Sequence, residues 1–198
     1  MKKVLITIFT TTILFLGSFN HAFSQISKLD KKNGFNKFQL GSTLSSIVDI
    51  AKLKQVANDV PNSETYIITD VENYSIAGYP LQNILLTFYK NKLFRISVMM
   101  PTIHARASSS SMQQSSTVRD KLIEEYGKWT KLEITPDDKA NNIVFKSNVD
   151  GNKVSLFIIQ YGLDWIDEEP YAKGDIYTFL SKDIYYLIEK ESKENAGF

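Results

Sequence analysis

Residues 83–98, NILLTFYKNKLFRISV, constrain the fold more than any other part of the chain. Apolar residues alternate with other residues on both sides of the central KNK, which predicts two antiparallel strands with one buried face. We expect Asn91 to take the left-handed turn conformation. Residues 143–161 repeat this design around Asp150-Gly151, a dipeptide that suits a tight hairpin turn. Two such hairpins predict an antiparallel sheet.

Apolar residues at helical spacing predict a helix before the first hairpin. After Gly41, either Ser42 or Thr43 is placed to cap this helix. Its apolar face would be formed by Leu44, Ile47, Val48 and Ala51. The same stretch lacks the second glycine and the lysine of a phosphate-binding loop, and it lacks the G-x-S-x-G of a nucleophile elbow.

Two more helices are predicted further along the chain. Residues 101–116 are a serine-rich boundary that weakens any helix. The next helix then presents Val118, Leu122 and Tyr126 and ends at Gly127. We expect a loop over residues 135–142. A last helix, capped by Ser181, would present Ile184, Leu187 and Ile188.

Together these elements predict an α+β protein, with an antiparallel sheet of hairpins and helices packed on one face. Residues 38–198 are expected to form a single domain. The order of elements also suggests two similar halves, residues 38–100 and 108–198, each with a helix, a strand and a long hairpin. Residues 25–37 are polar and charged, so we expect a flexible lead-in there.

Residues 1–24 have the composition of a secretory signal peptide. Lys2 and Lys3 precede an apolar run, and small and polar residues follow it up to an expected cleavage after Ser24. The apolar run is shorter than the roughly 20 residues that span a bilayer, which disfavours a permanent anchor. We therefore expect a periplasmic or secreted protein whose mature chain has no membrane span.

Charge and cysteine content exclude several classes of function. Without Lys2 and Lys3, 21 basic residues remain against 22 acidic ones, so no basic surface favours nucleic acid. The chain has no cysteine, which excludes disulfides, thiolate metal sites and a lipidated cysteine. His104 is the one histidine of the mature chain, and no spacing pairs it with a nucleophile. We expect no cofactor, no metal site and no catalytic residue.

Residues 162–175, GLDWIDEEPYAKGD, are unusually acidic. Their carboxylates are Asp164, Asp167, Glu168, Glu169 and Asp175. The plain interpretation is a solvated acidic loop between two strands. Calcium binding and acid catalysis are alternatives, although the spacing does not match an EF-hand.

Aromatic residues flank these acids, as they do on many binding surfaces. If the protein has a recognition site, we expect it in this segment. The candidate binding residues are Trp165, Asp167, Glu168, Glu169 and Tyr171.

The phrase FQLGSTLSSI, followed by a strand and ILLTFYKNKLFRISV, resembles a pattern of small exported α+β domains. In that pattern a phrase of the type "lG.t..ev" opens a helix and "l.f.ngkL..i" makes a hairpin. The small lipoproteins of the outer-membrane β-barrel assembly machinery and the tandem-domain β-lactamase inhibitor proteins use this architecture. The resemblance covers about residues 38–98, implies protein binding over catalysis, and assigns no functional residue. The chain differs from the assembly lipoproteins in lacking their lipidated cysteine.

The sequence therefore favours a non-catalytic binding or interaction module of the bacterial cell envelope, with a protein or other envelope component as its partner. The alternative is a secreted hydrolase that acts on glycan or peptide through the acidic segment from Asp164 to Asp175. The sequence does not specify the oligomeric state.

Overall fold

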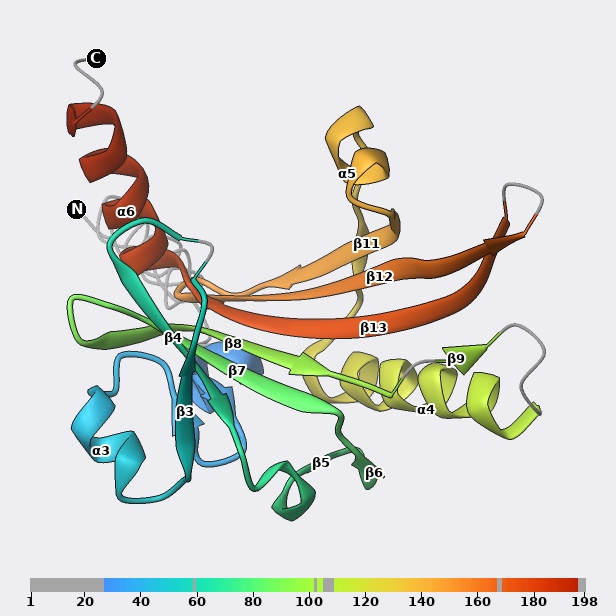
Figure 1. Ribbon diagram of the computed structural model, residues 1–198, viewed down its shortest axis with the longest axis horizontal. Helices are drawn as coiled ribbons and strands as arrows, with labels where there is room; N and C mark the ends of the chain where they lie inside the picture. The colour runs from blue at the N-terminus through green and yellow to red at the C-terminus, as the bar shows by residue number, and fades with distance from the viewer. Residues whose placement is uncertain (1–26, 59, 102, 105–108, 167–168, 196–198) are drawn as a thin grey trace, which may run out of the picture.

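The computed structural model describes residues 27–58, 60–101, 103–104, 109–166 and 169–195. The expected signal peptide, residues 1–24, lies outside the described residues. Figure 1 shows the arrangement of the described elements.

A single antiparallel sheet crosses the whole protein (Figure 1), which confirms the α+β class. Its strands follow the order β10-β11-β12-β13-β8-β7-β4-β3, and β9 pairs with β13 beside this path. The strands are β3 Leu53–Val56, β4 Ser63–Ile68, β7 Asn83–Tyr89, β8 Lys92–Met99, β9 Ile103–His104, β10 Thr130–Lys131, β11 Ile143–Asp150, β12 Val154–Ile166 and β13 Glu169–Ser181. Two small ribbons lie apart from it: β1 Gly34–Phe35 with β2 Phe38–Gln39, and β5 Ser75–Ile76 with β6 Tyr79–Pro80.

The strand order is that of two four-stranded units joined at their last strands. β3, β4, β7 and β8 follow the helix α3, Leu44–Val48, and β10 to β13 follow the helix α4, Ser109–Tyr126. The two units meet where β8 pairs antiparallel with β13, from Met99 opposite Ile176 to Arg95 opposite Leu180. The first unit contains one strand, β3, beyond the helix, strand and hairpin expected from the sequence.

The β7–β8 hairpin has the predicted form. Asn91 has a φ of 59° and Lys90 a φ of 47°, so both turn residues are left-handed. Apolar side chains of both strands are buried on one face of the sheet; among them Leu86 and Ile96 are directly paired and fully buried. The hairpin is therefore confirmed, together with its turn residue.

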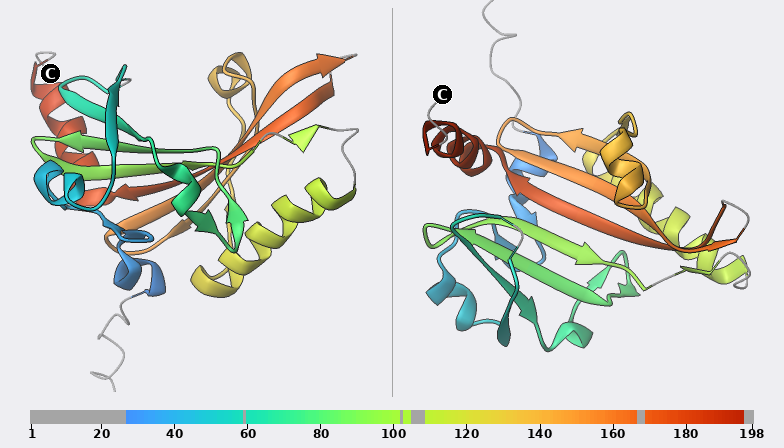
Figure 2. Two further views of the ribbon diagram at one scale, coloured as in Figure 1. Left: turned by 60° about the horizontal axis from the view of Figure 1, so that its bottom comes forward. Right: turned by 45° about the horizontal axis from the view of Figure 1, so that its top comes forward.

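Helices α2, α3 and α4 cover one face of the sheet. They bury Leu29, Ile47, Val118 and Leu122 against sheet residues such as Phe179, in one continuous core. Figure 2, left, shows α2 and α4 beneath the sheet. We call the opposite side, which carries Arg95, Ser97, Phe157, Ile159 and Leu180, the outer face.

The details of the helices differ from the expectation at several places. Thr43 caps α3 as predicted, with its hydroxyl accepting from the Ser46 N–H, but α3 ends at Val48 and leaves that side chain 57% exposed. Gly127 ends α4 with a φ of 103°, as predicted. However, α4 begins at Ser109, so the expectation that the serines up to residue 116 weaken the helix is wrong from Ser109 on.

Residues 135–142 were expected to be a loop, and this is wrong. They contain the helix α5, Pro136–Ala140, because Thr135 and Asp138 form a capping box and Pro136 occupies the first turn. The last helix, α6, runs over Lys182–Asn195 as expected, but none of its residues is buried. Its predicted apolar face therefore does not join the core. A short 3-10 helix, η2, covers Val71–Asn73.

The expected flexible lead-in over residues 25–37 is also wrong for its described part. Residues Lys28–Lys32 form α2, whose Leu29 is 1% exposed, and Phe35 of β1 is 7% exposed. Charged residues surround these two buried apolar side chains, so the composition of the segment suggested flexibility. The reason for the order is a carboxylate, Asp30, that binds a distant turn.

Asp30 ties the N-terminal segment to the turn between β11 and β12. Its carboxylate accepts hydrogen bonds from the backbone N–H groups of Asn152 (2.7 Å), Lys153 (2.8 Å) and Val154 (3.0 Å). Partial burial raises the pKa of Asp30, but these three bonds and one from the Ser27 side chain outweigh it and hold the pKa below its ordinary value.

Gly151 is needed beside this carboxylate. The turn is longer than the two-residue turn that Asp150-Gly151 predicted, because the last strand pair is Asp150 with Ser155. A Cβ at position 151 would overlap the Asp30 Oδ1 atom and lie 2.7 Å from the Ser27 Oγ atom. The glycine therefore serves the close approach of Asp30 and not a left-handed turn.

We predict that Asp30→Ala lowers the free energy of unfolding by about 2 kcal/mol, because it leaves three backbone N–H groups without their charged acceptor. The measurement is urea unfolding followed by circular dichroism. Asp49→Ala, at an exposed position after α3, is the matched control and should change stability by less than about 0.5 kcal/mol. Equal effects of both substitutions would contradict the role of Asp30.

The lowered pKa of Asp30 also predicts a pH dependence. The folded value lies below the ordinary value of 3.8, so the stability that Asp30 adds is fully present above 3.8 and is lost as pH falls through the folded value. The stability difference between the wild-type protein and Asp30→Ala should therefore shrink as pH is lowered below about 4. Unfolding curves of both proteins at several pH values measure it, and a constant difference would contradict the assignment.

Candidate functional site

The acidic segment is the outer part of a long hairpin and not a loop. β12 and β13 pair up to Trp165 opposite Pro170 and Ile166 opposite Glu169. Asp167 and Glu168 lie outside the described residues. The expectation of a loop is therefore wrong for most of this segment, because β12 continues through Gly162 and Asp164 despite their low strand propensity.

We call residues 162–166 and 169–173 the arm. β11 pairs with β12 only as far as Tyr161, so the arm extends beyond β11. Among the described residues, β9 is the strand that continues beside the arm, with His104 opposite Ala172. Register shifts around Asp164 interrupt the pairing within the arm. Such shifts bend a strand, and Figure 1 shows the far end of β12 and β13 turning away from the rest of the sheet.

The arm brings some of the predicted site residues together. Trp165 lies on β12 opposite Pro170, so Tyr171 is on the neighbouring strand one position beyond its partner. Glu169 lies at the start of β13, opposite Ile166. Three of the candidate residues thus share the end of one hairpin.

Asp175 does not belong to this group. It is 3% exposed in the inner part of β13, where its Oδ1 atom accepts a hydrogen bond of 2.7 Å from the Gln160 Nε2 atom. The cluster of five carboxylates expected from the sequence is therefore wrong for this residue. Strand β13 carries it away from the tip and into the sheet.

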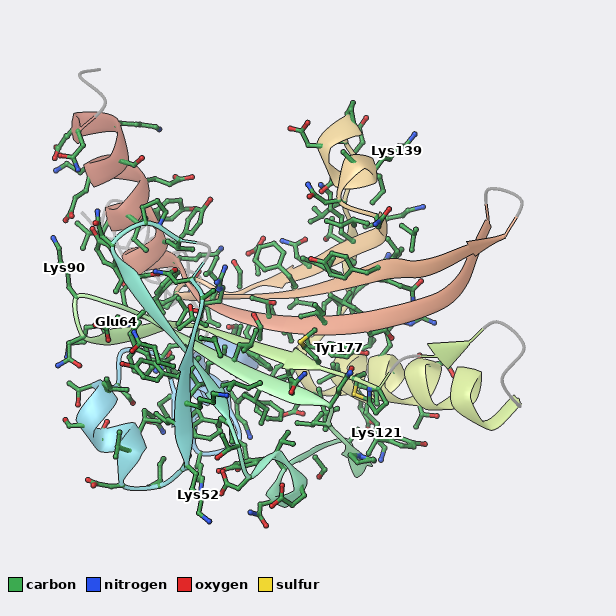
Figure 3. The ribbon with its side chains drawn as sticks, in the orientation of Figure 1. Lys52, Glu64, Lys90, Lys121, Lys139 and Tyr177 are labelled. Carbon is green, nitrogen blue, oxygen red and sulfur yellow. The ribbon has the colours of Figure 1, made fainter. Side chains whose placement is uncertain are left out.

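Tyr177 lies two residues further along β13, between the sheet and α4 (Figure 3). Its side chain is fully buried, and its hydroxyl has no hydrogen-bond partner among the described residues. Burial, and next to it the charge of Asp175, raises the pKa of Tyr177 well above its ordinary value. This tyrosine stays neutral and acts as a core residue.

A groove of about 470 Å³ lies on the outer face, between the sheet and α6. We call it the α6 groove. Sequence analysis did not find it, although residues 184–188, IYYLI, are apolar all round the helix, which is more than one buried face requires. The residues that line its apolar middle are Phe157, Ile159, Leu180, Tyr185 and Tyr186.

The polar end of the α6 groove is internally paired. The Asp150 carboxylate accepts from the Asn148 amide at 2.7 Å and from the Ser155 hydroxyl, and the Lys182 Nζ atom lies 3.0 Å away. Partial burial raises the pKa of Asp150, but these donors together lower it below its ordinary value. The carboxylate is therefore a charged and well-bound group at one end of the groove.

Polar contacts hold α6 at both ends. At its start, the Lys182 N–H donates to the Lys153 carbonyl and its Nζ atom to the Gly151 carbonyl, both at 2.9 Å. Near its end, Glu191 accepts from the Tyr89 hydroxyl and from Lys90, both at 2.6 Å. Figure 3 shows Lys90 at the β7–β8 turn, on the side of the molecule where α6 stands. The helix thus bridges the outer face.

The contacts near the end of α6 shift the pKa values of all three groups that form them. Hydrogen bonding to Glu191 raises the pKa of Tyr89 and of Lys90, and the same contacts, with that of Lys90 the largest, lower the pKa of Glu191. All three groups keep their ordinary charges at neutral pH.

Within the part of the chain that the structure describes, no group of three or more His, Cys, Asp and Glu side chains is placed to hold a metal ion. No helix among the described residues reaches the length and apolar character that a membrane span requires.

Comparisons with protein families, with curated proteins and with solved structures find no match to this chain.

Proposed function

We propose that the protein is an exported, non-catalytic binding module of the bacterial cell envelope, and that the arm carries its recognition site. The observation that supports this most is the extension of β12 and β13 beyond β11, which puts Trp165, Glu169 and Tyr171 at the end of one hairpin. Residues 1–24 support export, because a charged start, an apolar run and small residues follow one another there.

The chemistry of the arm favours a protein partner. Tryptophan and tyrosine are enriched among the residues that contribute most to binding free energy at protein interfaces. Residues 162–173 also contain four carboxylates and one lysine, so a partner with a basic and apolar surface fits them. Charges of this kind accelerate association, and their effect declines with salt concentration.

The hydrolase alternative has less support. Acid catalysis on glycans uses two carboxyl groups on either side of the bond that breaks. Asp175 is buried in the sheet and bound by Gln160, so it is not available for this role at the arm. The remaining carboxylates of the segment support the charge of a binding surface.

We predict that Trp165→Ser weakens binding to the envelope partner at least about 30-fold in Kd, because a central tryptophan contributes about 2 kcal/mol or more. The measurement is capture from an envelope fraction with wild-type and variant protein, followed by titration of the recovered protein. Val48→Ser, at an exposed apolar position on α3, is the matched control and should bind like wild type.

The triple variant Asp167→Asn, Glu168→Gln, Glu169→Gln separates binding from hydrolysis. In a binding module it slows association at low salt and retains most of the affinity. Hydrolysis of glycan or peptide that copurifies with the wild-type protein and disappears in this variant would contradict the proposed function. Equal binding by wild type and Trp165→Ser would contradict the site.

A further inference from the structure

The α6 groove lies beside an apolar patch on α6 itself. Tyr185, Tyr186 and Leu187 are 40%, 60% and 40% exposed, and they are three of the six large apolar side chains that are exposed in the described part of the chain. Isolated helices of about 14 residues are only marginally stable in water, and α6 buries none of its residues in the monomer. Polar contacts hold α6 at both ends, and burial of its apolar side chains would stabilise it further.

We propose that the α6 groove and this patch form the interface of a homodimer, in which each copy places its α6 tyrosines against the groove of the other. A two-fold interface uses the same surface on both copies, so a surface with both a protrusion and a recess can fit a second copy of itself. Here Tyr186 protrudes, and the recess above Phe157 and Ile159 begins directly beside it. This inference goes beyond the proposed function, because it involves no residue of the arm.

The exposed apolar area of α6 is a part of what a dimer needs. At about 200 Å² for a large side chain, the exposed parts of the three α6 residues amount to roughly 280 Å². A standard interface buries about 800 Å² on each partner, with an apolar core inside a polar rim. The patch is about a third of this area. In the proposed dimer it forms the core, and the groove and the charged residues of α6 supply the rest.

The charges around the groove favour a neutral partner such as a second copy. Lys182 is paired with Asp150 at 3.0 Å, and Lys90 with Glu191 at 2.6 Å, so these ion pairs on either side of α6 are complete within one chain. A strongly acidic or basic partner would find no unpaired charge in these pairs. Without Lys2 and Lys3 the chain itself is close to neutral, so two copies do not repel each other.

The tyrosine pair is already arranged for contact. The rings of Tyr185 and Tyr186 are 6.1 Å apart and meet edge to face at 67°. An aromatic pair that is ordered before association loses less side-chain entropy on binding. This lowers the cost of dimerisation.

The test is sedimentation equilibrium of the wild-type protein at concentrations up to about 100 μM, which reveals dimers with a Kd of about 10 μM or lower. The wild-type protein should have twice the monomer mass. Tyr186→Lys places a charge in the core of the proposed interface and should weaken dimerisation at least about tenfold. Val48→Lys changes a similarly exposed residue on α3 and should remain dimeric.

A second variant, Ile159→Lys, changes the recess and should also give a monomer; circular dichroism checks that both variants keep the fold. A monomeric wild-type protein would overturn the proposal and leave the groove to another occupant. A dimer that survives both substitutions would overturn it as well, because the interface would lie elsewhere. Trp165→Ser should lose the partner of the arm and keep the dimer, so failure of the proposed function is distinguishable.

Discussion

The pairing of β8 with β13 is the contact on which the rest of the structure depends. Five residue pairs join the two four-stranded units there, and on the outer face the hydroxyls of Ser97 and Thr178 lie 3.2 Å apart. On the other face Ile96 and Phe179 are opposite each other and buried. Because this seam lies in the middle of the sheet, the helices of both units cover one core.

The proposed binding surfaces lie at the margins of this scaffold. The arm is the part of β12 and β13 that extends beyond β11. α6 directly follows β13, at the other end of the same strand. β13 therefore positions both surfaces, one beyond each end of the seam. A rigid sheet that carries projecting elements is a common way to present a binding site, because the elements vary without disturbing the core.

Local patterns in the sequence predicted the parts of the fold that local interactions determine. The β7–β8 hairpin, the Thr43 cap and the Gly127 stop depend on residues a few positions apart, and all three are confirmed. The order of α2 depends on Asp30 and a turn more than a hundred residues away, which no local pattern reveals. The capping box at Thr135 could have been recognised in the sequence and was missed. For the candidate site, the sequence indicated the residues, and the fold adds that those of the arm lie on one hairpin.

Native-state hydrogen exchange tests most directly the claim that one seam holds the scaffold while the binding elements lie outside it. The account predicts that the paired amides of β8 and β13, from 95 to 99 and from 176 to 180, exchange only through global unfolding, with one common free energy. Amides of the arm and, in a monomeric variant, of α6 should exchange through smaller, local openings. Different free energies for β8 and β13, or an arm as protected as the seam, would contradict it.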